Sequence, residues 1–114
     1  MTIYVSSSFA MKMLTATDIG CATYITSKTL EEVEDLVEAA VERGETVVSA
    51  VRNQDIAAVL SEMSRLKLTF NLQTFKLVKG DVLFYANYLG PRIPRHATQL
   101  PPGGHVEWYQ ISVL

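Results

Sequence analysis

The charged side chains of this 114-residue chain fall into two groups of opposite sign. Residues 28–45 hold seven acidic residues against Lys28 and Arg43, whereas residues 63–103 hold six lysines and arginines against Asp81 alone. The net charge of −2 therefore conceals a region that can attract anions. A guanidinium presents its N–H donors in a fork that matches a phosphate group. We therefore expect anion binding to be possible, but only at one local site.

Cysteine and histidine are too scarce for several other kinds of chemistry. Cys21 is the single cysteine, and His96 and His105 are the only histidines. One cysteine forms no internal disulfide, and these few residues cannot build a structural zinc site. A low cysteine count fits a reducing compartment. No uncharged apolar run reaches about 18 residues, and residues 1–4 lack the basic flank of a signal peptide. We therefore expect a soluble, cytoplasmic protein with no metal, no cofactor and no membrane partner.

The elements that must position the polar residues are predicted from hydrophobic periodicity. The chain is 48% apolar and 19% charged, with no repeat or linker, which favours one domain over residues 1–114. The pattern predicts the order β-β-α-β-α-β-β-β, in an α/β (α+β) fold with a mixed sheet of five to six strands covered by two helices on one face. The expected strands are 3–5, 21–26, 46–51, 68–78, 82–89 and 106–113, and the expected helices are 30–43 and 54–66.

The first helix has the clearest start and stop. Thr29 and Glu32 have the spacing of a capping box, and Gly44 supplies the stop. The acidic residues of this helix lie on the face opposite its apolar stripe, so we expect them to be a solvated surface.

Three further local signals lie later in the chain. Asn53 precedes the second helical pattern, where asparagine is among the best N-caps. The tripeptide at 79–81, Lys-Gly-Asp, suits a hairpin turn. Residues 90–104 hold all four prolines and are expected to form an irregular loop.

Several short motifs in chain order resemble those of a known family. They are Tyr4 to Leu14, Ser49-Ala50-Val51-Arg52-Asn53, Asn71, Gly80-Asp81, Arg92-Ile93-Pro94 and Trp108-Tyr109-Gln110-Ile111. Taken in the same order, they resemble six features of the viral ring nucleases. The first three are the opening strand, the Ser-Ala-Ile-Gly-His turn and the Asn-Arg strand. The last three are the Gly-Asp hairpin, the Arg-Leu-Pro-Glu-Gly loop and the terminal aromatic strand. The viral ring nucleases are type III anti-CRISPR proteins first seen in viruses of thermophilic archaea.

The resemblance implies a homodimer that holds a cyclic oligoadenylate across its twofold axis. A twofold-symmetric ring suits such a dimer, because each protomer presents the same groups to half of the ligand. The family's enzymes cleave the ring without metal: a ribose 2′-hydroxyl attacks the adjacent phosphate, and a histidine protonates the departing 5′-oxygen. Histidine suits this step because its pKa lies near neutral pH.

The sequence departs from the family at the residues that would do this chemistry. Asn53 stands where the histidine is expected, and an amide cannot deliver a proton at physiological pH. Arg95 replaces the loop glutamate, Leu72 the strand arginine and Arg52 the glycine before the histidine, whereas Arg92 is retained. This combination indicates binding without turnover, so we lean against an enzyme and assign no catalytic residue.

The resemblance leads to the hypothesis of a viral or mobile-element anti-defence protein that sequesters a cyclic nucleotide messenger. The residues expected to bind the ligand are Ser7, Ser8, Arg52, Asn53, Arg92 and Arg95. The bound ring could equally be a cyclic dinucleotide, a cyclic trinucleotide or a cyclised ADP-ribose. Most of the aromatic residues are expected in the core or at a dimer interface.

Two alternatives stay open. An active, metal-independent ring nuclease would use His96 as a relocated general acid. A small DNA-binding regulator would use the basic region, but the second helix is followed by predicted strands and not by a helix–turn–helix, so DNA is the less favoured partner.

Overall fold

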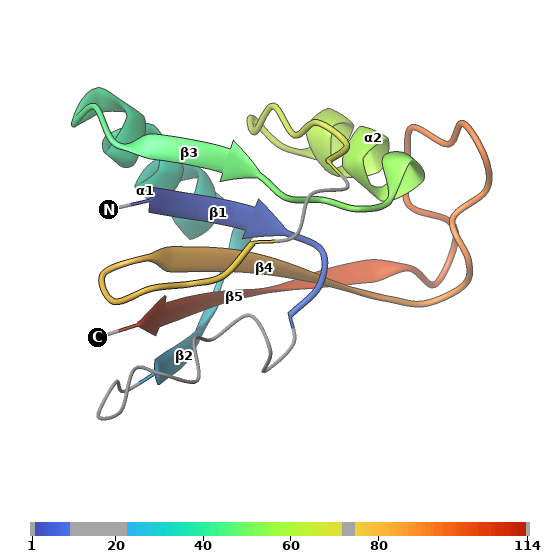
Figure 1. Cartoon of the computed structure of the whole chain (residues 1–114). Coiled ribbons are helices and arrows are strands. Elements are labelled where there is room, and N and C mark those ends of the chain that lie inside the picture. The colour runs from blue at the N-terminus through green and yellow to red at the C-terminus, as the bar shows by residue number, and fades with distance from the viewer. Residues whose placement is uncertain (1, 10–22, 72–74, 114) are drawn as a thin grey trace.

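The computed structural model describes residues 2–9, 23–71 and 75–113. Over these residues the chain forms two helices and five strands (Figure 1). In chain order they are β1 (Thr2–Ser6), β2 (Thr23–Lys28), α1 (Leu30–Glu42), β3 (Thr46–Ser49), α2 (Gln54–Met63), β4 (Val82–Leu89) and β5 (His105–Val113).

The strands form one mixed sheet in the order β2-β5-β4-β1-β3. Strand β1 runs parallel to both β3 and β4, whereas β5 is antiparallel to β4 and to β2. This arrangement confirms the predicted mixed sheet in an α+β fold. Because β1, β3 and β4 are parallel, their carboxyl ends lie at the same edge of the sheet, which we call the carboxyl edge.

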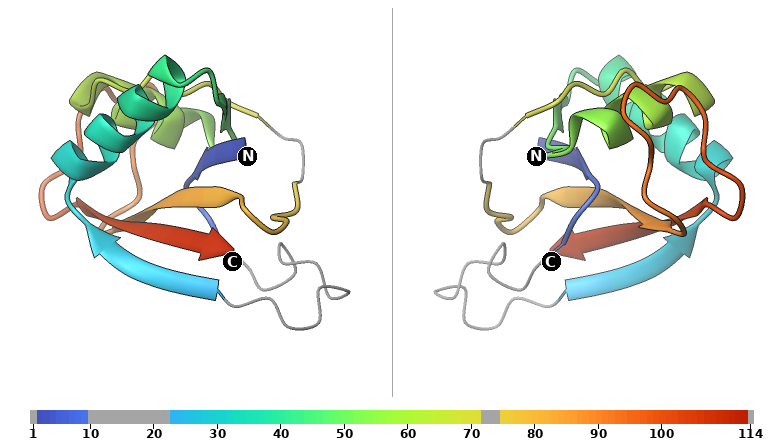
Figure 2. Two further views of the ribbon diagram at one scale, coloured as in Figure 1. Left: turned by 90° about the vertical axis from the view of Figure 1, so that its left-hand side faces the viewer. Right: turned by 90° about the vertical axis from the view of Figure 1, so that its right-hand side faces the viewer.

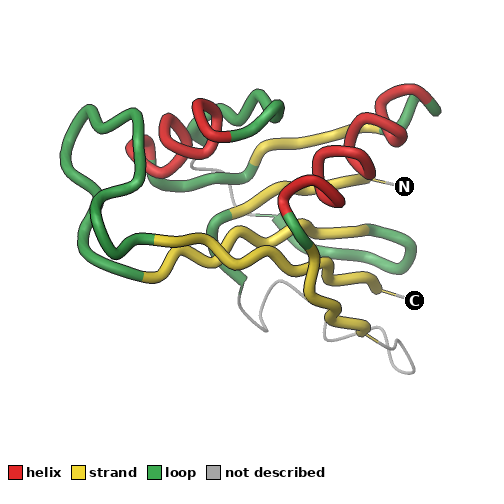
Figure 3. Tube along the Cα trace, turned by 180° about the vertical axis from the view of Figure 1, so that it is seen from behind, coloured by secondary structure: helices red, strands yellow, loops and turns green. Residues whose placement is uncertain are grey.

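Both helices cover the same face of the sheet (Figures 2 and 3). The core between the helices and this face is made of buried side chains from α1, α2, β1, β4 and β5, together with Leu66. They are Ile3, Val5, Val33, Val37, Ala40, Leu60, Leu66, Phe84, Ala86 and Trp108. The helical spacing in α1 and the alternation in β1 and β4 together point these residues inward.

The other face of the sheet, which we call the open face, has a smaller apolar cluster. Leu83, Ile111 and Val113 on this face are buried with Leu77, and the ring of Phe75 stacks on that of Tyr4 with centroids 4.5 Å apart. The segment 75–78 therefore covers part of the open face.

The predicted strand over 68–78 is wrong in the part that the structure describes. Residues 68–71 and 75–78 form no strand, and the first of these segments has only an isolated bridge between Val51 and Phe70. Side-chain hydroxyls take the place of a strand ladder here: Ser61 Oγ bonds to the amide and carbonyl of Leu68, and Ser49 Oγ to those of Thr69. In residues 75–78 the alternation reflects the packing of Leu77, which is buried, and of Phe75, which is partly buried, against the open face.

The predicted turn at 79–81 forms, but it does not join two strands. Gly80 has a φ of +93°, and Asp81 N donates to Val78 O over 2.9 Å. The buried carboxylate of Asp81 accepts from Val78 N at 3.0 Å and from Thr2 N at 3.1 Å. The turn therefore ties the start of β4 to the start of β1.

The capping box and the stop of α1 are confirmed. Glu32 N donates to the Thr29 hydroxyl over 3.1 Å, and Thr29 N donates to Glu32 Oε1 over 3.0 Å. Gly44 has a φ of +79° and ends the helix with backbone bonds to its last turn. This left-handed conformation favours glycine over residues that carry a Cβ.

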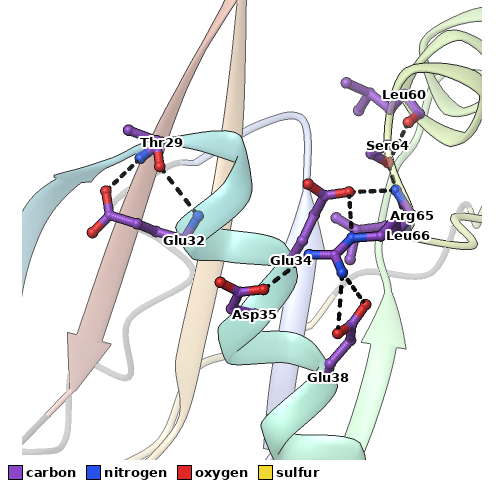
Figure 4. Close-up of polar contacts among 9 residues, drawn as sticks. All are labelled: Thr29, Glu32, Glu34, Asp35, Glu38, Leu60, Ser64, Arg65 and Leu66. Atoms are coloured by element: carbon purple, nitrogen blue, oxygen red, sulfur yellow. Dashed lines mark hydrogen bonds and ion pairs between the residues drawn. The ribbon is translucent and has the colours of Figure 1, made fainter.

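The expectation that the acidic residues of α1 are all a solvated surface is wrong. Glu34 is 9% exposed and accepts from the backbone N of Arg65 over 2.6 Å. The Arg65 guanidinium pairs with Glu34, Asp35 and Glu38 over 3.3, 2.9 and 3.1 Å (Figure 4). These carboxylates raise the pKa of Arg65, with the Asp35 hydrogen bond contributing most. The acidic residues thus fasten α1 to the segment after α2.

Helix α2 ends three residues before the predicted boundary at Leu66. Ser64 has extended backbone angles, and its hydroxyl donates to Leu60 O over 2.5 Å and accepts from Leu66 N over 3.2 Å. The hydroxyl replaces helical hydrogen bonds, so the helix stops while Leu66 still reaches the core. Strand β3 likewise ends at Ser49, two residues before the predicted boundary.

Candidate functional site

The first part of the site lies where β1 and β3 end at the carboxyl edge. In their parallel register Val5 lies opposite Ser49, and Ala50 N donates to Val5 O over 2.8 Å. Residues 6–8 and 50–53 therefore leave the sheet side by side, although they are more than 40 positions apart in sequence.

The hydroxyl of Ser6 joins these two turns. Ser6 is fully buried, and its Oγ accepts from Ser8 N over 3.1 Å and lies 2.9 Å from Ser8 O and 3.3 Å from Ala50 O. Ser7 is half-buried and Ser8 is exposed. Ser6 is thus the residue that shapes the turn. The sequence did not predict this role, since its only signal was the run of three serines.

Asn71 supports the second turn from the neighbouring segment. Its Nδ2 donates to Ser49 O over 2.9 Å, and its backbone N donates to Val51 O over 2.8 Å. Asn71 therefore holds the chain that leads into Arg52. Its place among the motifs did not predict this supporting role.

Asn53 is the N-cap of α2, as predicted. Its Oδ1 accepts from Ile56 N over 3.0 Å, which satisfies one amide of the first helical turn. Asn53 and Arg52 are both exposed, so the capped helix start and the arginine face solvent together.

The loop 90–104 forms the second part of the site and lies alongside the start of α2 (Figure 1). Its two ends lie so close together that a Cβ on Gly90 would be 2.6 Å from the Cα of Gly104. The Tyr88 hydroxyl donates to Pro91 O and holds the first residues of the loop. His96 has a φ of +61°, and its backbone N approaches Asp55 Oδ1 at 3.4 Å. Asp55, in the first turn of α2, thus links the helix to the loop.

The structure brings most of the predicted site residues to this edge. Ser7, Ser8, Arg52 and Asn53 follow the adjacent ends of β1 and β3. Arg95 precedes His96, whose backbone N lies 3.4 Å from Asp55 Oδ1 at the start of α2. Arg92 stands in the same loop, but none of the contacts recorded among the described residues joins it to the other five.

The arginines of the site differ from the others in their ion pairing. Arg52, Arg92 and Arg95 are exposed, and within residues 2–9, 23–71 and 75–113 none of them pairs with a carboxylate. Arg43 and Arg65, in contrast, are held by acidic partners. The three site arginines therefore keep their donors available for an anion.

Other chemical sites have little support in the described residues. No group of three His, Cys, Asp or Glu side chains in that part of the chain could hold a metal ion. Cavities of about 350 to 470 Å³ lie beside α1 and α2, and those described take in none of the six predicted ligand-binding residues. Cys21 and Leu72 lie outside the described residues. No described helix is long and apolar enough to cross a membrane.

Comparisons with known proteins identify the fold only. No family model matches the chain, and no curated protein matches it. Among solved structures, B116 of Sulfolobus turreted icosahedral virus is similar over 97% of this chain and 98% of its own, with a TM-score of 0.77 and 15% sequence identity. The chain therefore has the fold of a protein encoded by a Sulfolobus virus.

Proposed function

We propose that this chain is an anti-defence protein of a virus or mobile element that binds and sequesters a cyclic oligonucleotide messenger at a dimer interface. The observation that carries this proposal is the absence of a carboxylate partner, among the described residues, for Arg52, Arg92 and Arg95. Unpaired guanidinium groups at one edge of a sheet suit the phosphates of a nucleotide ring.

Asn53 supports binding without cleavage. An amide has no proton to donate to a leaving 5′-oxygen at neutral pH, and its Oδ1 is already occupied by the helix cap. The fold shared with a Sulfolobus virus protein agrees with a viral origin. A chain of 114 residues has little surface with which to surround such a ring alone, which favours a homodimer.

The first experiment is binding of labelled cyclic tetra-adenylate to the purified protein, followed by chromatography of the recovered ligand. We expect the ring to be bound and intact, at one ring per two protomers by native mass spectrometry. Absence of binding to cyclic tetra-adenylate and to the smaller cyclic nucleotides would overturn the proposal.

Arginine variants locate the binding site. Arg52→Ala, Arg92→Ala and Arg95→Ala should each weaken binding about tenfold or more, because each removes a charged hydrogen-bond donor to phosphate. Arg43→Ala is the matched control: it makes the same change at the end of α1, where Arg43 pairs with Glu45 over 3.1 Å. Equal effects of the site and control variants would contradict the location.

The same assays decide between the alternatives. Linear products whose formation is lost in His96→Ala would identify a ring nuclease. Salt-sensitive binding of duplex DNA, with no binding of the ring, would identify a DNA-binding protein. Either result would replace sequestration as the function.

A further inference from the structure

The loop 90–104 is joined to α2 by one hydrogen bond. Among the residues that the structure describes, His96 N to Asp55 Oδ1, over 3.4 Å, is the single hydrogen bond from residues 92–103 to another element. Asp55 stands in the first turn of α2. Ile93 is buried and anchors the chain before this point. The position of the part of the loop that follows Ile93 therefore depends on Asp55.

His96 belongs to a tight turn whose backbone needs support. Ala97 N donates to Pro94 O over 3.2 Å and closes the turn. Its two central residues are Arg95 and His96. His96 has a φ of +61° and is the one non-glycine residue of the described chain in the left-handed region. This conformation is unfavourable for a residue with a Cβ and persists where other contacts hold it. The hydrogen bond to α2 is such a contact.

The same hydrogen bond leaves the Arg95 guanidinium available. Asp55 accepts from the backbone of His96, and within the described residues it forms no ion pair with Arg95. Asp55 stands three residues after Arg52, and the loop lies alongside this start of α2 (Figure 1). Asp55 thus holds the turn that carries Arg95 near Arg52 and does not neutralise either arginine.

The far side of the loop does not fix the position of this turn. Residues 98–100 and the end of α2, at Glu62 and Met63, line a cavity of about 400 Å³. This part of the loop is therefore not closely packed on the helix, and the contact at the start of α2 is the one that sets the turn.

We propose that Asp55 is a positioning residue for Arg95: it holds the turn 94–97 on the first turn of α2, so that the Arg95 guanidinium can contact the same ligand as Arg52. The role of the arginines rests on the proposed function, whereas the hold on the turn rests on the contacts above. The negative charge of Asp55 suits the start of a helix but repels a phosphate. The charge and the acceptor oxygen of Asp55 can therefore be separated by substitution.

The test compares Asp55→Asn with Asp55→Ala. Both variants lose the negative charge, but only Asp55→Asn keeps an oxygen that can accept from His96 N. By nuclear magnetic resonance, the His96 amide should exchange with deuterium about threefold faster or more in Asp55→Ala than in Asp55→Asn. Asp55→Asn should also bind cyclic tetra-adenylate about threefold more tightly or better than Asp55→Ala does. Equal exchange rates in the two variants would overturn the proposal.

Arg95→Ala shows whether Asp55 acts through Arg95. In that background the two Asp55 variants should bind the ring equally, because no guanidinium remains to be positioned. The same difference in affinity with and without Arg95 would overturn the positioning role and leave sequestration intact. If none of these proteins binds the ring, the proposed function fails, and exchange of the His96 amide alone then decides whether Asp55 holds the turn.

Discussion

Replacing Asn53 should separate the stability of α2 from the binding of a ligand. Asn53→Ala removes the acceptor that lies 3.0 Å from Ile56 N and leaves that amide to water. Loss of such an N-cap costs about 1 kcal/mol of folding free energy. For a domain of this size that corresponds to a fall in Tm of about 4 °C. Asn53→Asp keeps an acceptor at the cap, so its stability should stay within about 0.5 kcal/mol of the wild type.

Urea denaturation followed by circular dichroism measures these free energies, and cyclic tetra-adenylate binding is measured on the same three proteins. The two properties should rank the variants differently: Asn53→Asp should be as stable as the wild type yet bind more weakly, because its carboxylate repels phosphate. A stability of Asn53→Ala within about 0.3 kcal/mol of the wild type would refute the capping role. Undiminished binding by Asn53→Asp would refute the placement of a phosphate beside this residue.

Three further predictions concern the fold. The hydrogen bond from the Thr29 backbone is the main cause that lowers the pKa of Glu32 below its ordinary 4.5, so the stability that this bond contributes is present at neutral pH and is lost as pH falls through the lowered value. Glu32→Gln should therefore lose less stability than the wild type between pH 7 and pH 3, and an equal loss in urea titrations would contradict this. Leu60→Ala should cost about 2–5 kcal/mol by urea denaturation, because Leu60 is only 1% exposed in the core; a cost below about 1 kcal/mol would show that the core closes around the gap. Gly90→Ala should lower Tm, because Gly90 has a φ of +136° and a Cβ there would clash with Gly104; an unchanged Tm would mean that the loop ends can separate freely.

Local signals in the sequence were sufficient wherever the interacting groups are close along the chain. The Thr29 and Glu32 capping box, the stop at Gly44 and the Asn53 cap each join atoms no more than a few residues apart. Such contacts depend on residue type and spacing alone, so they were predicted correctly.

The predicted strand over 68–78 shows what alternation alone cannot decide. Alternating apolar side chains indicate that every second residue is buried, but they do not identify the surface that buries them. Leu77 is buried and Phe75 partly buried against the face of the sheet, while Leu68 and its neighbour Thr69 bond to the hydroxyls of Ser61 and Ser49.

The charge pattern has the same limit as the hydrophobic pattern, because it does not identify the partner of each side chain. The sequence places Arg65 and Arg92 in one basic region, but it does not identify their partners. In the fold Arg65 is surrounded by the acidic residues of α1, whereas Arg92 meets no carboxylate among the described residues. Counting charges therefore overstated the number of cations available to an anion.

The sequence by itself determined the fold class, most of the helices and strands, and the caps of both helices, because these depend on hydrophobic period and on contacts within about four residues. Only the tertiary structure decided that the turns that carry Ser8 and Arg52 leave the sheet side by side. These neighbours are set by the register of strands that are far apart in the chain, and register results from packing of the whole sheet.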